Sequence, residues 1–123
     1  MPVKMKLNLN GKAHKHQGTK GGTYFLQKDT TNGKAHWINQ SGYKAIWWSP
    51  EGWWTVGSLD NLGSSAAGID GPSSNDSPPN KIINGWKYWN GEEWHDTNCV
   101  FFEDLTFKQG KLLHLFSKNS ILK

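Results

Sequence analysis

Closely spaced turn signals divide this chain into short segments and strongly limit what it can fold into. Asn-Gly pairs occur at residues 10–11, 32–33, 84–85 and 90–91, and a Ser-Pro-Glu-Gly run occupies residues 49–52. Both residues of an Asn-Gly pair tolerate positive φ, and proline and glycine suit the second and fourth positions of a type I turn. Aromatic residues are frequent between these turns, and no capped helical pattern of three turns occurs before residue 104. The pattern therefore predicts strands joined by hairpins.

The positions of the strands follow from the alternation of apolar and polar residues. We expect strands at residues 3–9, 23–27, 35–39, 43–48, 53–56, 86–89, 92–95, 99–102 and 105–107, and a short strand near 66–69. Residues 112–117 suit a strand or a short helix equally. Residues 10–22 are predicted to form a basic loop, and residues 57–80 a long loop rich in Gly, Ser and Pro.

These elements predict an all-β fold, a small antiparallel barrel or a two-sheet sandwich of short strands with aromatic hairpins. The length of 123 residues is that of a single domain, and such a domain can bury a core without metal or disulfide. The prediction is one β domain over residues 1–123.

Four of the eight tryptophans lie between residues 45 and 56, two on each side of the Ser-Pro-Glu-Gly turn. Side chains alternate between the two faces of a strand, so Trp47 and Trp48 must point in opposite directions, as must Trp53 and Trp54. The simplest interpretation is that most of these rings form the core. The alternation nevertheless places some of them on a second face, where an exposed ring must be covered or used.

A flat aromatic surface bordered by polar groups suits the apolar face of a sugar ring, so the rings on the second face predict a carbohydrate site. Such a site would use Trp48 with Trp53, or Trp47 with Trp54. Its expected rim is Trp89, Trp94, Glu92, Asn39 and Asn90. The expected function is non-enzymatic ligand binding, with a glycan as the best hypothesis. One alternative is a module that binds a partner protein or itself, because aromatic enrichment is equally typical of protein interfaces.

A second alternative is a small hydrolase around His95, Asp96 and Cys99, and it depends on residue types alone. Cys99 stands next to the apolar run 100–102 and is predicted to be buried. The acidic pairs 92–93 and 103–104 are adjacent strand residues that face opposite ways, so neither pair can act on one substrate. The sequence has no motif for a phosphate loop, and His14 and His16 are two ligands, which do not complete a metal site. No catalytic residue, metal or cofactor is predicted.

All fourteen basic residues are lysines, and the net charge is +4. Residues 1–28 and 105–123 hold ten lysines and no acid, whereas residues 29–104 hold four lysines and all ten acids. Arginine supplies the bidentate fork that reads guanine, so its absence makes nucleic acid an unexpected partner. The expected partner is a glycan or a protein, and the oligomeric state stays open.

The sequence shows neither the apolar core of a signal peptide nor a stretch approaching the ~20 apolar residues of a membrane span. Cys99 is the single cysteine, so no internal disulfide can form and a reducing compartment is compatible with the sequence. The compartment itself is not predicted.

Several short motifs between residues 22 and 95 follow one order: G-T-Y-F (22–25), N-G-K-A-H-W (32–37), W-T-V-G (54–57) and G-W-K-Y-W (85–89). This order resembles that of the Trp/Gly-rich β modules that recur in algal, protist and marine invertebrate proteins. Ala35 departs from it, because those modules often have proline there. The resemblance implies a compact β module and assigns no activity or site residue.

Overall fold

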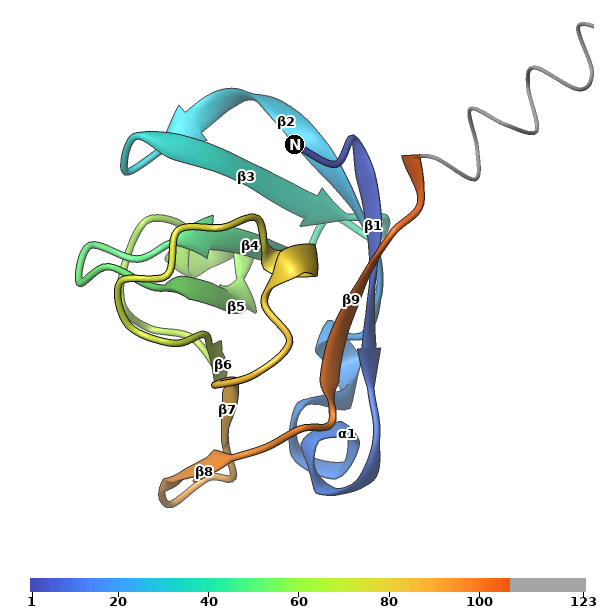
Figure 1. The fold of residues 1–123 in the computed structure, drawn as a ribbon, viewed down its shortest axis with the longest axis vertical. Helices are drawn as coiled ribbons and strands as arrows, with labels where there is room; N and C mark the ends of the chain where they lie inside the picture. Colours follow the sequence, from blue (N-terminus) through green and yellow to red (C-terminus); the bar gives the residue numbers. More distant parts are fainter. Residues whose placement is uncertain (107–123) are drawn as a thin grey trace, which may run out of the picture.

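The computed structural model describes residues 1–106, which form one strongly curled antiparallel sheet of nine strands (Figure 1). The strands are β1 (Lys4–Leu9), β2 (Gly22–Thr31), β3 (Lys34–Asn39), β4 (Lys44–Trp48), β5 (Trp54–Ser58), β6 (Ile69–Asp70), β7 (Lys87–Trp89), β8 (Trp94–Asp96) and β9 (Val100–Asp104). One short helix, α1 (Gly11–Gln17), and three 3₁₀ turns, η1 (Gly18–Lys20), η2 (Leu59–Asn61) and η3 (Pro79–Lys81), complete this part of the chain.

The order of strands in the sheet is β8-β7-β6-β5-β4-β3-β2-β1-β9. Strands β1 to β8 are neighbours in chain order, and the chain then crosses from the β8 edge to pair β9 with β1. Only three residues, 97–99, connect β8 to β9, so the two edges of the sheet must curl toward each other. The all-β prediction is confirmed, and the barrel-like form is the one adopted.

The apolar core lies on the concave face of this sheet. Register aligns one row of side chains across β3 to β7, and every member of that row is buried: Trp37, Ile46, Val56, Ile69 and Tyr88. On the opposite, outer face the corresponding row runs through Trp47, Thr55, Asp70, Lys87 and Asp96. The two faces of β5 to β8 therefore differ in polarity, as expected for a sheet with one solvated side.

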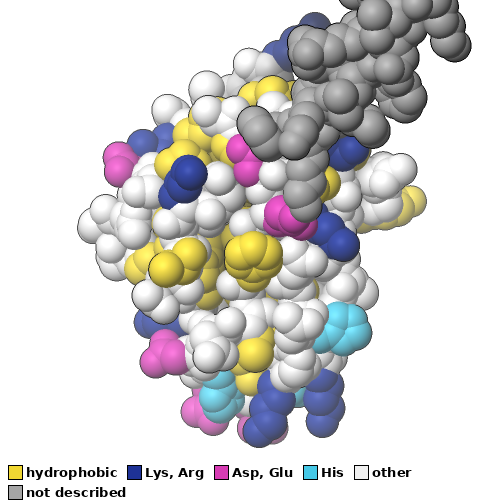
Figure 2. All heavy atoms as spheres, turned by 45° about the vertical axis from the view of Figure 1, so that its right-hand side comes forward, with side chains coloured by type: hydrophobic (Ala, Val, Ile, Leu, Met, Phe, Trp, Pro, Cys, Tyr) yellow, Lys and Arg dark blue, Asp and Glu magenta, His cyan; other side chains and the backbone are white. Residues whose placement is uncertain are grey.

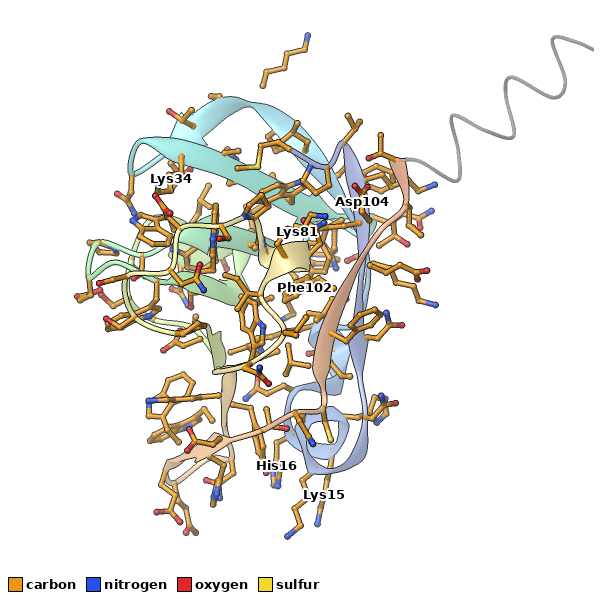
Figure 3. All side chains as sticks on the ribbon, viewed as in Figure 1. Lys15, His16, Lys34, Lys81, Phe102 and Asp104 are labelled. Atoms are coloured by element: carbon orange, nitrogen blue, oxygen red, sulfur yellow. The ribbon has the colours of Figure 1, made fainter. Side chains whose placement is uncertain are left out.

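The concave face is closed by elements that join its two edges. Phe102 of β9 packs against Trp86 with ring centroids 4.9 Å apart, and the Trp86 indole donates to the carbonyl of Ile82, just after η3. Figure 3 shows Phe102 pointing from β9 toward the interior. These contacts bring the β9 side of the sheet onto the segment that precedes β7, so the curl is held by packing as well as by strand pairing.

The prediction of a loop over residues 10–22 is wrong, because this segment contains α1 and η1. The helix buries Ala13 and Gln17, four residues apart on one face, and the Gln17 side-chain amide donates to the carbonyl of Trp89. A seven-residue helix with only one small apolar residue has no visible sequence periodicity. Its position depends on docking against β7, since helices this short are not stable in isolation.

The predicted loop over residues 57–80 is more structured than expected. It begins with the end of β5, contains η2 and the two-residue strand β6 at 69–70, and ends in η3. The short strand predicted near residues 66–69 is β6. The predicted strand at 105–107 extends past the described residues, and the segment 112–117 lies outside them. Within residues 1–106, no helix has the length and apolar character needed to cross a membrane.

Candidate functional site

The Ser-Pro-Glu-Gly turn joins β4 and β5 with a register that differs from the predicted one by one residue. The amide of Gly52 donates to the carbonyl of Ser49, as a type I turn requires, and Gly52 then adopts φ +100°. The amide of Ser49 donates to Trp53, so the loop has three residues and Trp48 lies opposite Trp54. A type I turn followed by a glycine of positive φ is a common three-residue hairpin.

This one-residue shift in register changes which tryptophans share a face. Trp48 and Trp54 lie on the inner face, where their rings meet edge to face at 5.4 Å, so neither predicted pairing forms one surface. Trp54 is fully buried. Trp47 points outward but is also fully buried, because the chain after β5 covers it and Ser64 accepts a hydrogen bond from its indole. Trp47 and Trp54 are therefore core residues and cannot contact a ligand.

Trp48 is partly exposed at the rim of the core, and its ring is occupied. The ammonium of Lys34 lies 5.0 Å from the Trp48 ring centroid, and Lys34 also pairs with Asp76 at 3.5 Å. Of the four tryptophans around the turn, Trp53 is the one that faces an external cavity. Trp47 and Trp53 thus both reach the second face, as the alternation predicts, but Trp47 is covered and Trp53 faces the cavity.

The second hairpin also departs from its expected register. The sequence predicts a two-residue Asn90-Gly91 turn with Trp89 opposite Glu92, whereas the structure pairs Trp89 with Trp94. The Asn90 side-chain oxygen accepts the amides of Glu92 and Glu93, and the Asn90 amide donates to the Glu93 carbonyl, so residues 90–93 separate the paired residues Trp89 and Trp94. Side-chain acceptance of this kind is typical of Asn in turns. As a result, the Trp89 and Trp94 rings pack edge to face at 5.6 Å.

The two hairpins bring Trp53 and Trp94 to one small external cavity. This cavity, which we call the tryptophan slot, has a volume of about 270 Å³ and is lined by Trp53, Asp70, Gly71, Pro72, Ser73, Lys87 and Trp94. Trp94 is 39% exposed and Trp53 is half-buried. The slot therefore combines two aromatic rings with a carboxylate, an ammonium group and a hydroxyl, at the lower end of the size range of ligand pockets.

Asp70 is the acid among the residues that line the slot, and its surroundings shift the pKa of its carboxyl. Burial raises the pKa of its carboxyl above the ordinary value of 3.8, while a 2.5 Å hydrogen bond from the Thr55 hydroxyl and the charge of Lys87 act in the opposite direction. The Trp53 indole also lowers this pKa, although its buried N–H is not aligned for a hydrogen bond with any residue of the described chain. Asp70 is held in place by Thr55 and retains acceptor capacity toward the slot.

The other predicted rim residues have structural roles in turns. Asn39 accepts the amides of Tyr43 and Lys44 and so shapes the turn between β3 and β4. Asn90 organises the β7–β8 turn, and its side-chain nitrogen contacts His95. Glu92 is exposed in the same turn. None of the three lines the tryptophan slot.

The three polar residues of the slot, Asp70, Ser73 and Lys87, escaped the sequence analysis. Asp70 and Ser73 stood inside a segment predicted to be a loop, and Lys87 alternated with aromatic residues as any solvent-facing lysine would. Only the alignment of β6 with β7, which pairs Asp70 with Lys87, brings them together.

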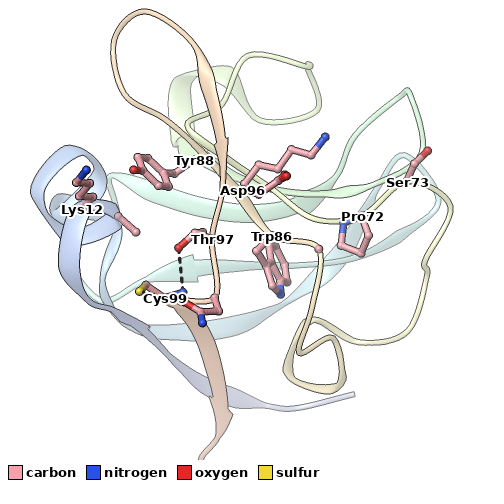
Figure 4. Close-up of a pocket in the computed structure, with 12 residues that line it drawn as sticks. Lys12, Pro72, Ser73, Trp86, Tyr88, Asp96, Thr97 and Cys99 are labelled. Carbon is pink, nitrogen blue, oxygen red and sulfur yellow. Dashed lines mark hydrogen bonds between the residues drawn. The ribbon is translucent and has the colours of Figure 1, made fainter.

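The residues of the hydrolase alternative do not form a catalytic group. Asp96 and Cys99 line a cavity of about 880 Å³, but His95 does not. His95 stacks on Tyr88 at 5.6 Å and contacts Asn90, on the face of β8 opposite to Asp96. Figure 4 shows Asp96 and Cys99 at separate places along the wall, with Thr97 between them. The thiol of Cys99 faces Asn98 at 3.5 Å, so no base or acid activates it among the described residues.

Histidines of α1 do not assemble a metal site either. In residues 1–106 no three His, Cys, Asp or Glu side chains come together in a group that could hold a metal ion. His16 stacks on Tyr88 at 5.9 Å and helps to dock α1 against β7.

Comparison with known proteins adds no relative from which a function could be inferred. No family model, curated protein or solved structure matches the chain. What the fold and the site define is a small barrel-like β protein with an aromatic and acidic slot on its outer face. The similarity to Trp/Gly-rich β modules stays a prediction.

Proposed function

We propose that this protein binds a carbohydrate without transforming it, and that the tryptophan slot is the binding site. The observation that carries the proposal is the presence of Trp53 and Trp94 in one cavity together with Asp70 and Lys87. An aromatic ring covers the apolar face of a pyranose, while carboxylate, ammonium and hydroxyl groups meet its hydroxyls. A site that combines aromatic and polar groups in this way suits a sugar better than a purely apolar ligand.

The dimensions of the slot favour a small part of a glycan over a large ligand. A volume of about 270 Å³ is suited to one or two sugar units, with the rest of the chain outside. The rings come from different hairpins, and Trp94 is supported from behind, since it packs on Trp89. A site preorganised in this way loses little side-chain entropy on binding.

The test uses soluble neutral oligosaccharides that differ in their backbone sugar, followed by tryptophan fluorescence and calorimetry. We expect one of them to bind, and Trp94→Ala to weaken that binding by about tenfold or more while the far-ultraviolet spectrum is unchanged. Tyr43→Ala is the matched control, because Tyr43 is 73% exposed and lies outside the slot. Binding that survives in Trp94→Ala would contradict the assignment of the slot.

The protein-interaction alternative stays a prediction. Phe25 and Phe101 are exposed aromatic residues of β2 and β9, away from the slot, and could contact another protein. A mass in solution that rises with concentration, together with no response to any saccharide, would favour that alternative.

A further inference from the structure

A second cavity adjoins the tryptophan slot and shares one of its walls. It has a volume of about 460 Å³ and is lined by Lys20, Lys44, Ser58, Asn61, Ser65, Ala66, Ala67, Gly68, Trp89 and Trp94. Trp94 lines both cavities, so a sugar ring stacked on this indole would lie at the boundary between them. We call the second cavity the lysine pocket.

The lysine pocket has positive charge and no acidic lining residue in the described chain. Lys20 comes from η1 and Lys44 from β4, so the fold brings two like charges together that are far apart in sequence. Burial lowers the pKa of the Lys20 ammonium, and the charge of Lys44 lowers it further. Glu51, an exposed side chain outside the lining, accepts a hydrogen bond from Ser65. The two ammonium groups therefore repel each other with little compensation.

Specific contacts hold Lys20 at this position. Its ammonium donates to the Gln17 side-chain oxygen at 2.6 Å, and the nitrogen of the same amide donates to the Trp89 carbonyl at 2.6 Å. Gln17 is buried against Gly68, where a Cβ atom would collide with its amide group. A neutral amide thus fixes the lysine beside the Trp89 and Trp94 rings without neutralising it. Most surface lysines have no such constraint.

A basic surface elsewhere on the molecule makes a useful contrast. Figure 2 shows lysine and histidine side chains gathered at the lower end of one face, near α1. Lys12, Lys15, His14 and His16 of this helix are all exposed. Their charges are open to water and ions, whereas those of the lysine pocket lie beside low-polarity aromatic walls, where electrostatic attraction to an anion is stronger.

We infer that the ligand is an acidic saccharide, whose sulfate or carboxylate group lies between Lys20 and Lys44 while its sugar ring stacks on Trp94. This inference rests on the proposed carbohydrate function and names the chemical class of the glycan. An anion in the lysine pocket would relieve the repulsion between the two ammonium groups and accept a charge-assisted hydrogen bond from each. Ser58, Asn61 and Ser65 supply additional polar groups at the same wall.

The experiment compares each oligosaccharide with its own sulfated form, using dextran with dextran sulfate and desulfated κ-carrageenan with κ-carrageenan, as oligomers of equal length. We expect the sulfated forms to bind about tenfold or more tightly. Lys44→Gln should bring their affinity down to that of the unsulfated forms. Lys20→Gln should have the same effect on affinity. If loss of the contact between Lys20 and Gln17 disturbs α1, Lys44→Gln remains the decisive variant. Lys28→Gln is the control, because it removes one charge from an exposed lysine outside the pocket.

The possible results separate this inference from the proposed function. Unsulfated oligomers that bind through Trp94 with equal affinity, unaffected by Lys44→Gln, would overturn the inference and leave carbohydrate binding intact. An equal loss in Lys28→Gln and Lys44→Gln would also overturn it, since the attraction would then reflect net charge alone. No binding by either form would contradict both proposals.

Discussion

Asp70 illustrates how one residue of the slot can serve ligand binding at a cost to stability. Its carboxyl is partly buried, and burial raises its pKa, so the folded protein holds a proton on Asp70 more tightly than the unfolded chain does. Stability is therefore lost as pH rises from the ordinary carboxyl pKa through the raised one. A carboxylate kept in such a place is typical of a functional site.

We predict that Asp70→Asn removes this loss and weakens saccharide binding. The free energy of unfolding of the variant relative to the native protein should increase between pH 3 and pH 7, because Asn cannot ionise and can still accept from the Thr55 hydroxyl. Urea unfolding at both pH values measures the difference. If the relative stability of the variant instead falls as pH rises, the carboxyl pKa of Asp70 is lowered by folding and the prediction is wrong.

At the scale of elements, the short helix α1 connects the N-terminal strands to the site. Its last residue, Gln17, hydrogen-bonds to β7 and to Lys20, and thereby joins the helix, the β7–β8 hairpin and the lysine pocket. The last turn of the helix contains His14, Lys15 and His16, and its first turn has no acidic residue. Lysine near the C-terminus of a helix is favourable, although seven residues gain little stability from this alone.

We predict that Gln17→Ala destabilises the protein by about 1–3 kcal/mol, the cost of leaving buried hydrogen-bonding groups without partners. Backbone amides of α1 should also exchange faster with solvent, because the helix loses its anchor on β7. Urea unfolding and hydrogen exchange measure the two effects. Lys15→Ala, on the exposed face of the same helix, should change stability by no more than about 0.5 kcal/mol. Unchanged exchange in Gln17→Ala would show that other contacts dock α1.

The whole molecule depends on the closure between the β9 side of the sheet and the segment before β7. Phe102 and Trp86 provide the aromatic contact of this closure, and the amide of Thr97 donates to the carbonyl of Trp86. Strands β7 and β8, which carry Lys87 and Trp94 of the tryptophan slot, lie at one end of the sheet and are only three residues long each. Short edge strands hold their geometry when packing from elsewhere supports them.

We predict that Phe102→Ala costs about 3–5 kcal/mol, as removal of a buried phenylalanine does in other cores. The loss should lower the midpoint of unfolding measured by tryptophan fluorescence and by circular dichroism equally, because β9 and β7 belong to one closed unit. Phe101→Ala is the control, since Phe101 is on the same strand and 52% exposed. Separate midpoints for the two probes would mean that β9 unfolds independently of the sheet.

Several features of the fold and the site could be predicted from the sequence because they depend on local chemistry. Strand alternation places Met5, Leu7 and Leu9 in the core, and the Asn-Gly turn at 32–33 follows from the positive φ of both residues. Alternation also required that some tryptophans lie on a second face. The choice among them depended on loop length, because one additional residue in a hairpin reverses the face of every side chain that follows.

The sequence by itself determined that this protein is all-β, that it has aromatic hairpins and that its basic residues are all lysines. The tertiary structure alone decided that the sheet curls, that Trp47 is covered while Trp53 and Trp94 share a slot, and that Lys20 meets Lys44. The physical reason is the range of the interactions. Turn preference and alternation act over a few residues, whereas docking of α1 and closure by β9 depend on contacts between distant segments, which no local pattern encodes.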